Sequence, residues 1–195
     1  MYIERQNFEV KIMELVEPIR DIELIEKVKK ILANNGVRDL LLFSLGINTG
    51  LRISDILKLK VKDVKNKENV EIIEQKTGKR KRFPIHAVKN LLNDFIQFKS
   101  DDEYLFISRQ TNGKTPVITR QQAYNIINKA CRKAGIIDRI GTHTLRKTFG
   151  YHHYKKEKNV ALLQEIFNHS APSITLKYIG INQDVIFESL RDFSL

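Results

Sequence analysis

The sequence predicts a mainly α-helical domain with one small antiparallel β-hairpin, which is an α+β fold. Apolar residues recur at helical spacing along most of the 195 residues. One stretch breaks this pattern: NVEIIEQ and RKRFPI flank the turn sequence KTGK, as in a hairpin. The chain is 42% hydrophobic, which is enough to fill a core, and it has no repeat and no Gly/Ser linker. We therefore expect residues 21–195 to form one domain, preceded by an arm or linker at 1–20.

The amino-terminal part of the domain is predicted to hold two helices and a short third segment. The first helix begins near Asp21, whose side chain can cap exposed amides, continues through ELIEKVKKILANN and stops at Gly36. The segment VRDLLLFSLGIN is so apolar that its helix should be buried. Gly50 marks a turn before LRISDILKL, so Arg52 is expected at a junction between turn and helix.

The hairpin follows from Asn69, with Thr77 and Gly78 in its turn and Lys76 at its tip. Beyond it, the short extended segment EYLFIS and the loop RQTNGKTPV separate two helices of a second group. The expected helices of this group cover residues 86–99, 119–134, 144–155, 160–168, 173–178 and 184–190.

Charge and hydropathy restrict the partners. Lys and Arg outnumber Asp and Glu by 34 to 23, a net charge of +11, which favours polyanions through phosphate contact and counterion release. Charge alone does not distinguish DNA from RNA or from an acidic membrane. No apolar run approaches the roughly 20 residues of a membrane-spanning helix, and the amino terminus lacks a signal-peptide pattern. We therefore expect a cytoplasmic protein.

Neither a metal nor a cofactor is expected. Cys131 is the only cysteine, so an internal disulfide and a Cys-rich zinc site are excluded, and a buried thiol is the simplest interpretation. The adjacent His152 and His153 would point to different sides of a helix, which disfavours a shared metal. The sequence has no phosphate-binding glycine loop and no obvious carboxylate cluster for a divalent cation.

Arg52 and Arg146 are candidates for handling a phosphate. The transition state of phosphodiester chemistry spreads extra negative charge over nonbridging oxygens, and a guanidinium can place two N–H donors on an oxygen pair. His143 precedes Arg146 by three residues, so on a helix the two side chains share a face. The alternatives are solvated surface arginines and a structural histidine at the start of a helix.

Tyr178, nine residues after His169, is the candidate nucleophile. A phenol of pKa about 10 needs a base or a cationic pocket, and His143 or His169 would supply one. An alkoxide leaving group also needs a proton, for which Lys76 is the candidate. The alternative for Tyr178 is a packing role, and the alternative for Lys76 is a hairpin that merely attracts phosphate. The other basic residues of that hairpin, expected to contact DNA, are Lys79, Arg80, Lys81 and Arg82.

The order of four motifs resembles the tyrosine recombinase family, also called phage integrases: TGLRISDIL, EQKTGKRKRFPI, THTLRKTFGYHH and FNHSAPSITLKYIG. The resemblance extends over nearly all of the chain from about Asp21, and it implies the catalytic-domain architecture of that family. It assigns a set that we call the predicted catalytic residues: Arg52, Lys76, His143, Arg146, His169 and Tyr178. It also implies that Asp55 supports the site from behind.

The resemblance implies site-specific recombination or integration of double-stranded DNA. Tyr178 would attack the scissile phosphate and hold a 3′-phosphotyrosine, while the 5′-hydroxyl leaves with a proton from Lys76, without metal or ATP. In the family, a carboxy-terminal tail docks on a neighbouring subunit in the DNA-bound assembly, so a tetrameric synapse is expected here from a chain that is monomeric when free. On DNA the protein would be associated with the nucleoid.

The expected tail begins at about residue 182. Its amphipathic segment DVIFESLRDF would dock through Val185, Ile186, Phe187 and Leu190, or cover the protein's own core instead. Residues that would read bases lie on the helix after Thr119, where Arg, Gln and Asn suit the major groove, although an ordinary polar face has the same pattern. They are Arg120, Gln121, Gln122, Asn125 and Lys129.

Two departures from the family pattern are visible. Members that act alone usually carry an amino-terminal helical domain that closes around DNA, whereas here about 20 residues precede the first expected helix, and VEPIRD resembles the linker into the catalytic domain. Asn168 stands where glycine is more usual before His169, and asparagine tolerates the same left-handed backbone.

The sequence leaves three alternatives to a recombinase open. A noncatalytic DNA-binding protein or regulator with the same fold would bind DNA without a covalent product. A type IB topoisomerase-like enzyme would relax supercoiled DNA without joining new partners. An unrelated helical nucleic-acid-binding module would still bind after loss of both Arg52 and Arg146.

Overall fold

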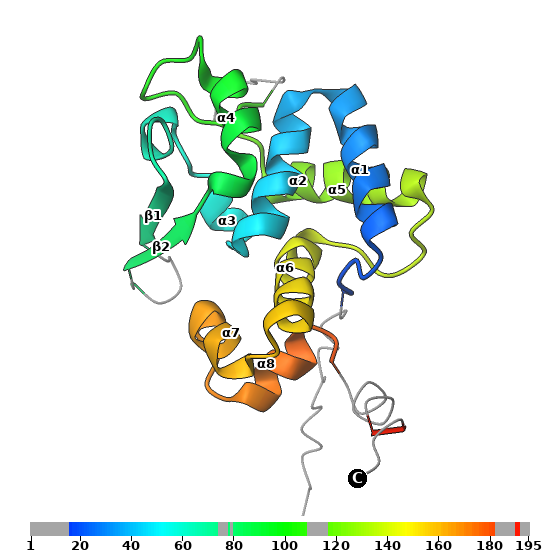
Figure 1. The fold of residues 1–195 in the computed structure, drawn as a ribbon. Helices are drawn as coiled ribbons and strands as arrows, with labels where there is room; N and C mark the ends of the chain where they lie inside the picture. The colour runs from blue at the N-terminus through cyan, green and yellow to red at the C-terminus, as the bar shows by residue number, and fades with distance from the viewer. Residues whose placement is uncertain (1–15, 74–77, 79, 109–116, 182–189, 192–195) are drawn as a thin grey trace, which may run out of the picture.

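The computed structural model describes residues 16–73, 78, 80–108, 117–181 and 190–191, and these are mainly helical (Figure 1). The hairpin strands form a two-stranded antiparallel sheet, so the predicted fold class is confirmed. The elements are α1 (Ile22–Asn35), α2 (Val37–Thr49), α3 (Ile53–Ile56), η1 (Val61–Asp63), β1 (Asn69–Ile73), β2 (Arg80–Pro84), η2 (His86–Val88), α4 (Lys89–Ile96), α5 (Arg120–Ala134), α6 (Thr142–Glu157), α7 (Val160–Phe167) and α8 (Pro172–Tyr178).

The start of α1 and the end of α2 follow the local sequence as predicted. The Asp21 carboxylate accepts hydrogen bonds from the amides of Glu23 and Leu24, at 2.7 and 3.4 Å. Gly50 ends α2 in the left-handed conformation, with φ of 64°. A Cβ atom at Gly50 would lie 2.5 Å from the Phe149 ring, so this turn requires glycine for both backbone and space.

The hairpin is antiparallel, with Asn69 opposite Pro84 and Ile73 opposite Arg80. Val70 and Phe83 face each other in this register and are buried, so one face of the hairpin belongs to the core. The predicted tip, Lys76 and Thr77, lies outside the described residues.

Several helix boundaries differ from the predictions. The predicted helix 86–99 starts as the 3₁₀ turn η2, and α4 ends at Ile96. The Val88 backbone at the junction, with φ of −121° and ψ of 7°, is not helical. Helix α6 begins at Thr142 instead of 144, because the Thr144 hydroxyl accepts a hydrogen bond from the Gly141 amide at 3.0 Å and caps the helix there. The extended segment EYLFIS makes isolated bridges, from Tyr104 to Lys60 and from Ile107 to Val117.

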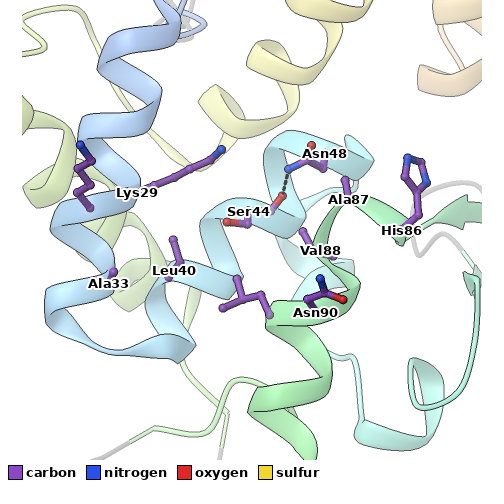
Figure 2. A pocket seen from close by; sticks show the side chains of 11 residues that line it. Lys29, Ala33, Leu40, Ser44, Asn48, His86, Ala87, Val88 and Asn90 are labelled. Atoms are coloured by element: carbon purple, nitrogen blue, oxygen red, sulfur yellow. Dashed lines mark hydrogen bonds between the residues drawn. The ribbon is translucent and has the colours of Figure 1, made fainter.

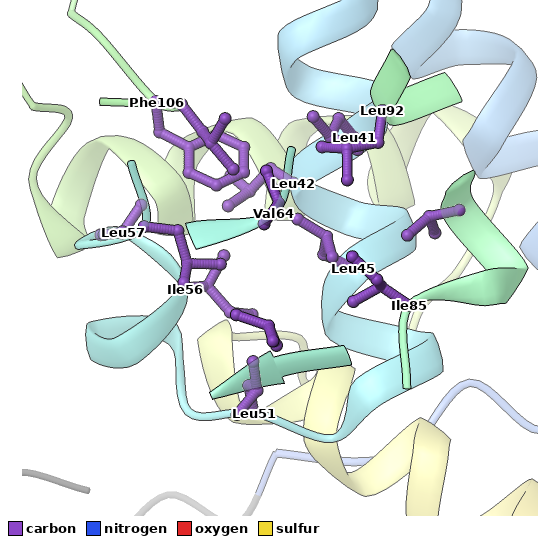
Figure 3. Packing of buried hydrophobic residues seen from close by; sticks show 14 of the residues in the cluster. Leu41, Leu42, Leu45, Leu51, Ile56, Leu57, Val64, Ile85, Leu92 and Phe106 are labelled. Carbon is purple, nitrogen blue, oxygen red and sulfur yellow. The ribbon is translucent and has the colours of Figure 1, made fainter. Parts of the chain in front are cut away.

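Clusters of buried hydrophobic residues fix how the described helices and the hairpin pack against one another. One joins α2, α3, the hairpin and α4, with Leu41, Leu45, Ile56 and Phe106 fully buried (Figure 3). A second packs α1 and α5 against α2 and includes Leu145 of α6. A third holds α7 and α8 together, and Phe149 of α6 packs against it. Helix α6 therefore connects α7 and α8 to the rest of the described domain (Figure 1).

Cys131 is buried in the second cluster, as predicted. Burial raises the pKa of its thiol to about 12, so the group stays protonated and unreactive. Among the described helices, none has the length and apolar character that crossing a bilayer requires.

Candidate active site

The described members of the predicted catalytic residues come together from separate elements. Arg52 is the N-cap residue of α3, directly after the Gly50 turn. His143 and Arg146 lie in the first turns of α6, His169 follows α7, and Tyr178 is the last residue of α8. Lys76 lies outside the described residues, so its position relative to this group stays a prediction.

Arg146 forms the buried centre of the group, with 3% of its surface exposed. One end of its guanidinium donates to the Gly50 carbonyl oxygen. Another nitrogen, Nη2, donates to the Phe167 carbonyl oxygen at 3.2 Å, and the guanidinium carbon lies 4.4 Å from the centre of the Phe167 ring. Arg146 thus ties the turn before α3 to the end of α7, and these contacts hold its charge in place before any substrate binds.

Tyr178 packs among aromatic rings with its hydroxyl near a histidine. Its Oη atom lies 3.4 Å from His143 Nδ1, and its ring centre is 5.1 Å from that of His169 and 5.4 Å from that of Phe167. His169 is oriented in turn by a hydrogen bond of 3.0 Å between its Nδ1 atom and Thr175 Oγ1. The phenol is therefore held in one place, with an imidazole within reach of its proton.

Opposing effects act on the Tyr178 phenol. Its desolvation raises the pKa above the ordinary value, while the nearby guanidinium groups of Arg146 and Arg52 lower it. The raised pKa means that Tyr178 is protonated at neutral pH. For this oxygen to act as a nucleophile, a base would have to remove the proton.

His143 is neutral at neutral pH for complementary reasons. Desolvation of its ring lowers the pKa, and the cations Arg146, Lys147, Arg52 and Arg120 lower it further. A neutral imidazole whose nitrogen faces a phenol can accept its proton. The surrounding positive charge makes His143 a weak base, suited to a proton that leaves only as the new bond forms.

Beside this group is a hollow of about 90 Å³ in which cationic side chains converge. Arg52, His143 and Arg146 line it, together with Arg120 at the start of α5. Such a cluster of guanidinium groups is suited to an anion such as a phosphate. Sequence reasoning placed Arg120 among base-reading residues and missed its position here, because the proximity of α5 to α3 and α6 has no local signal.

Asp55 is buried three residues after Arg52, with 5% of its surface exposed, and its amide donates to the Arg52 carbonyl oxygen at 2.9 Å. This places it behind the predicted site, and its supporting role stays a prediction. Asn168 adopts the left-handed conformation expected of it, with φ of 54° and ψ of 50°, and ends α7 immediately before His169.

The described basic residues of the hairpin have different surroundings. Lys81 Nζ donates to the carbonyl oxygens of Glu165 and Ile166, at 3.1 and 2.6 Å, and so caps the carboxyl end of α7. Arg82 pairs with Glu71 on the facing strand at 2.7 Å. Arg80 is exposed and Lys79 lies outside the described residues. Their contact with DNA stays a prediction.

On α5, Gln121, Asn125 and Lys129 are exposed and one helical turn apart. Gln122 instead caps the helix, because its side-chain oxygen accepts from the Thr119 amide at 2.8 Å. Base reading by these residues stays a prediction.

His152 and His153 have separate surroundings. His152 Nε2 donates to the Ile19 carbonyl oxygen at 2.9 Å, whereas the His153 ring packs at 5.6 Å from that of Phe149. In the part of the chain that the structure describes, no three metal-binding side chains gather.

Among the described residues, hollows also lie in two places away from this group. One of about 470 Å³ is lined by α1, α2 and the segment His86–Leu91, and Figure 2 shows Lys29, Leu40 and His86 around it. The other, about 720 Å³, lies between β2 and helices α6 and α7. No described member of the predicted catalytic residues lines either one.

A model of the phage integrase family matches residues 21–184. The chain is 49% identical over 182 residues to the probable integrase/recombinase YoeC of Bacillus subtilis (strain 168), covering 93% of this chain and 98% of that protein. It is 26% identical to the tyrosine recombinase XerA of Pyrococcus furiosus over 89% of this chain, but only 60% of that relative is covered.

Solved structures share the fold. The XerA recombinase superposes with a TM-score of 0.71 at 20% identity, covering 91% of this chain and 65% of that one. The XerH recombinase bound to a palindromic difH substrate, in a post-cleavage complex, superposes with a TM-score of 0.68 at 21% identity, covering 90% and 52%. The family match over most of the chain and the 49% identity to an integrase place the chain in the phage integrase family, and it is a tyrosine recombinase.

Proposed function

We propose that this recombinase cuts and rejoins double-stranded DNA at specific sites through a 3′-phosphotyrosine formed at Tyr178. The observation that supports this most directly is the Tyr178 hydroxyl 3.4 Å from His143 Nδ1, next to a hollow lined by Arg52 and Arg146. A nucleophile, a base and an anion-binding pair thus occupy one site, which is what transfer of a phosphoryl group to tyrosine requires.

In the proposed step, a scissile phosphate occupies the arginine-lined hollow. The Tyr178 oxygen attacks phosphorus as its proton passes to His143, and the bond to the 5′ oxygen breaks. Arg52 and Arg146 stabilise the charge that develops on the nonbridging oxygens. The 5′ oxygen leaves as a hydroxyl after taking a proton, for which Lys76 is the proposed donor.

The phosphotyrosine conserves the energy of the broken bond, so rejoining needs no ATP. Attack by a 5′-hydroxyl of another strand reverses the chemistry and releases Tyr178. The proposed functional unit is residues 21–195, with 1–20 as an arm or linker. It would act in the cytoplasm, on nucleoid DNA.

Several observations support DNA as the partner. The net charge is +11, and the structurally similar XerH is recorded with its difH substrate. A lambda integrase is recorded as a dimer bound to a COC′ core site. Integrase and recombinase relatives do not favour the noncatalytic or DNA-relaxing alternatives.

We further propose that residues 182–195 dock on a neighbouring subunit in a tetrameric DNA-bound synapse. Val185, Ile186 and Phe187 lie outside the described residues, and Leu190 is 59% exposed. Removing residues 182–195 should leave DNA binding by single subunits intact and abolish higher assemblies in native gels. Unchanged assembly would overturn this part of the proposal.

Covalent trapping tests the chemistry. The protein is mixed with a nicked candidate attachment site, from which the cleaved fragment diffuses away, and an SDS-resistant adduct is scored beside Tyr178→Phe. Tyr151→Phe is the matched control, because Tyr151 lies on α6 outside the site. An adduct with wild type and Tyr151→Phe but not with Tyr178→Phe is expected. Bound DNA without any adduct would overturn the proposal.

A further inference from the structure

The segment Val16–Arg20, which we call the strap, runs beside α6 and leads into α1 (Figure 1). Its backbone forms hydrogen bonds with the backbone or side chains of neighbouring elements at several points. These are Glu17 N to Arg139 O at 2.8 Å, Ile19 N to Thr148 Oγ1 at 2.9 Å, and His152 Nε2 to Ile19 O at 2.9 Å. Ile19 is buried in the same cluster as the inner face of α1. The strap is thus an ordered part of the domain on the helix that carries His143 and Arg146.

The strap also touches the chain just after the proposed nucleophile. Gly180, two residues beyond Tyr178, has φ of 78°, and a Cβ atom there would lie 2.7 Å from Arg20 Nη2 and 3.4 Å from the Pro18 ring. The left-handed backbone favours glycine at this position, and side chains of the strap lie close to this turn. The strap meets both α6 and the end of α8.

Lys147 lies between the strap and Tyr178. Its side chain is buried, with 4% of the residue exposed, and its Nζ donates to the Val16 carbonyl oxygen at 2.7 Å. The same ammonium lies 5.3 Å from the centre of the Tyr178 ring, within range of a cation–π contact. One cation thus contacts the strap and the ring that carries the reacting hydroxyl.

Burying an ammonium is unfavourable, which is visible in the lowered pKa of Lys147. A methionine of similar length would fill much of the same space without that cost. A cation at this position gains a cation–π attraction to the face of the Tyr178 ring, which a methionine does not. This attraction is strongest where water is excluded.

We propose that Lys147 is a positioning residue for Tyr178 and that the strap holds the Lys147 ammonium in place. The proposal rests on the proposed function of Tyr178 as nucleophile. His143 contacts the hydroxyl end of Tyr178, while Lys147 contacts the ring. Without the ammonium the whole side chain can swing about its Cα–Cβ bond, and the hydroxyl then leaves the line of attack on phosphorus. Displacements of about 1 Å in reacting groups can lower rates about 100-fold.

The test compares Lys147→Met, which keeps the length and removes the cation, with Lys147→Arg, which keeps a cation. Lys155→Met is the matched control, since Lys155 is an exposed lysine on the same helix. Single-turnover cleavage of nicked DNA is measured at saturating protein, together with the Kd for DNA. We expect Lys147→Met to cleave at least about tenfold more slowly with a Kd within about threefold of wild type, from loss of orientation alone. Lys147→Arg should recover part of the rate, and Lys155→Met should match wild type.

A second measurement does not depend on cleavage. With tyrosine rings labelled with carbon-13, Tyr178→Phe identifies the Tyr178 ring signals, and Lys147→Met should shift and broaden them while leaving Tyr104 unchanged. Equal cleavage rates for Lys147→Met and wild type would overturn the proposal, and so would unmoved Tyr178 signals. If wild type itself forms no adduct, the nucleophile assignment fails, and the ring signals alone decide whether Lys147 positions Tyr178. If Lys147→Met does not fold, Lys147→Gln replaces it in both measurements.

Discussion

At the scale of single residues, the two site arginines have different surroundings. Arg146 is 3% exposed and bonded to the carbonyl oxygens of Gly50 and Phe167, whereas Arg52 is half-buried at the mouth of the anion hollow. Both would face the phosphate, and the buried Arg146 also joins the turn before α3 to the end of α7. Replacing Arg146 should therefore lower the stability of the fold as well as the activity.

Arg146→Lys and Arg52→Lys should each lower the cleavage rate at least about 100-fold, because a lysine cannot reproduce paired N–H donors on a developing charge. Arg146→Lys should in addition destabilise the fold by about 1–3 kcal/mol, since buried carbonyl partners lose their donors. Arg52→Lys should cost less stability than Arg146→Lys, because Arg52 is only half-buried. Denaturant unfolding and single-turnover cleavage measure the two effects. Equal stability losses would contradict the distinction.

We predict that the pKa of His143 determines how the cleavage rate falls at acid pH. Because desolvation and four neighbouring cations lower the pKa, the neutral base persists below pH 6.5, the ordinary histidine value. Cleavage should therefore stay constant as pH falls from 8 to about 6.5 and decline only at lower pH, when His143 takes up a proton.

Single-turnover rates between pH 5 and 8, at DNA concentrations that saturate binding at each pH, measure this limb. In His143→Gln the rate should be low and the limb should disappear, because glutamine does not titrate. His86→Gln, at an exposed histidine outside the site, is the control. A limb centred above pH 6.5 in wild type would contradict the assignment.

At the scale of elements, short connections between helices position the side chains of the predicted site. The Gly50 turn carries Arg52 into α3 and presents the carbonyl that Arg146 holds. At the other side, Lys81 caps the last carbonyl groups of α7 and ties the hairpin next to the turn that bears His169. The hairpin therefore contacts the site region through strand β2, while a contact through its tip stays a prediction.

Gly50→Ala tests the first connection. Its left-handed backbone penalises alanine by about 1–2 kcal/mol, and the clash with the Phe149 ring at 2.5 Å adds about 1–3 kcal/mol. Gly78→Ala is the matched control, because Gly78 has nearly the same φ, 66° against 64°, but no described atom within 4 Å of the added Cβ. The denaturant concentration at the midpoint of unfolding should fall clearly further for Gly50→Ala than for Gly78→Ala. Equal midpoints would show that space around Gly50 is not limiting.

Local sequence signals predicted the presence of the helices and strands better than the residues at which they begin and end. Asp21 acts through its side chain on the amides that follow it, and Gly50 acts through its own left-handed backbone, so the start of α1 and the end of α2 were predictable. The early start of α6 depends on Thr144 reaching back to the Gly141 amide, a cap that an ordinary turn pattern does not reveal. In the segment 86–88, apolar periodicity suggested α-helix where the backbone forms a 3₁₀ turn.

At the scale of the whole molecule, the site depends on contacts between distant segments. Motif order predicted which residues belong to it, and the described ones do lie together. Sequence reasoning missed the place of Arg120 in the hollow and the burial of Lys147. Lys147 meets Val16 across 131 positions, and no local periodicity records a contact at that separation. A lysine in a basic chain is expected at the surface, so only the packed structure reveals this one.

The net charge of +11 is also a property of the whole molecule, but its basic residues should not contribute equally to DNA binding. Lys62 is bonded to Asp102 at 2.7 Å, which raises its pKa and neutralises the local charge. Lys129 is exposed on α5, the helix that also supplies Arg120 to the anion hollow. Binding to a DNA phosphate releases a counterion, whereas a lysine already paired with a carboxylate releases none.

The dependence of DNA affinity on salt should therefore distinguish these lysines. For wild type, the logarithm of the binding constant should fall linearly with the logarithm of salt concentration, by about 0.9 per phosphate contacted. Lys129→Ala should reduce this slope by about 1 and weaken binding to all sequences alike. Lys62→Ala, which removes the same formal charge, should leave the slope unchanged. Fluorescence anisotropy between 50 and 300 mM salt measures both, and equal slopes for the two variants would mean that α5 does not lie against the DNA backbone.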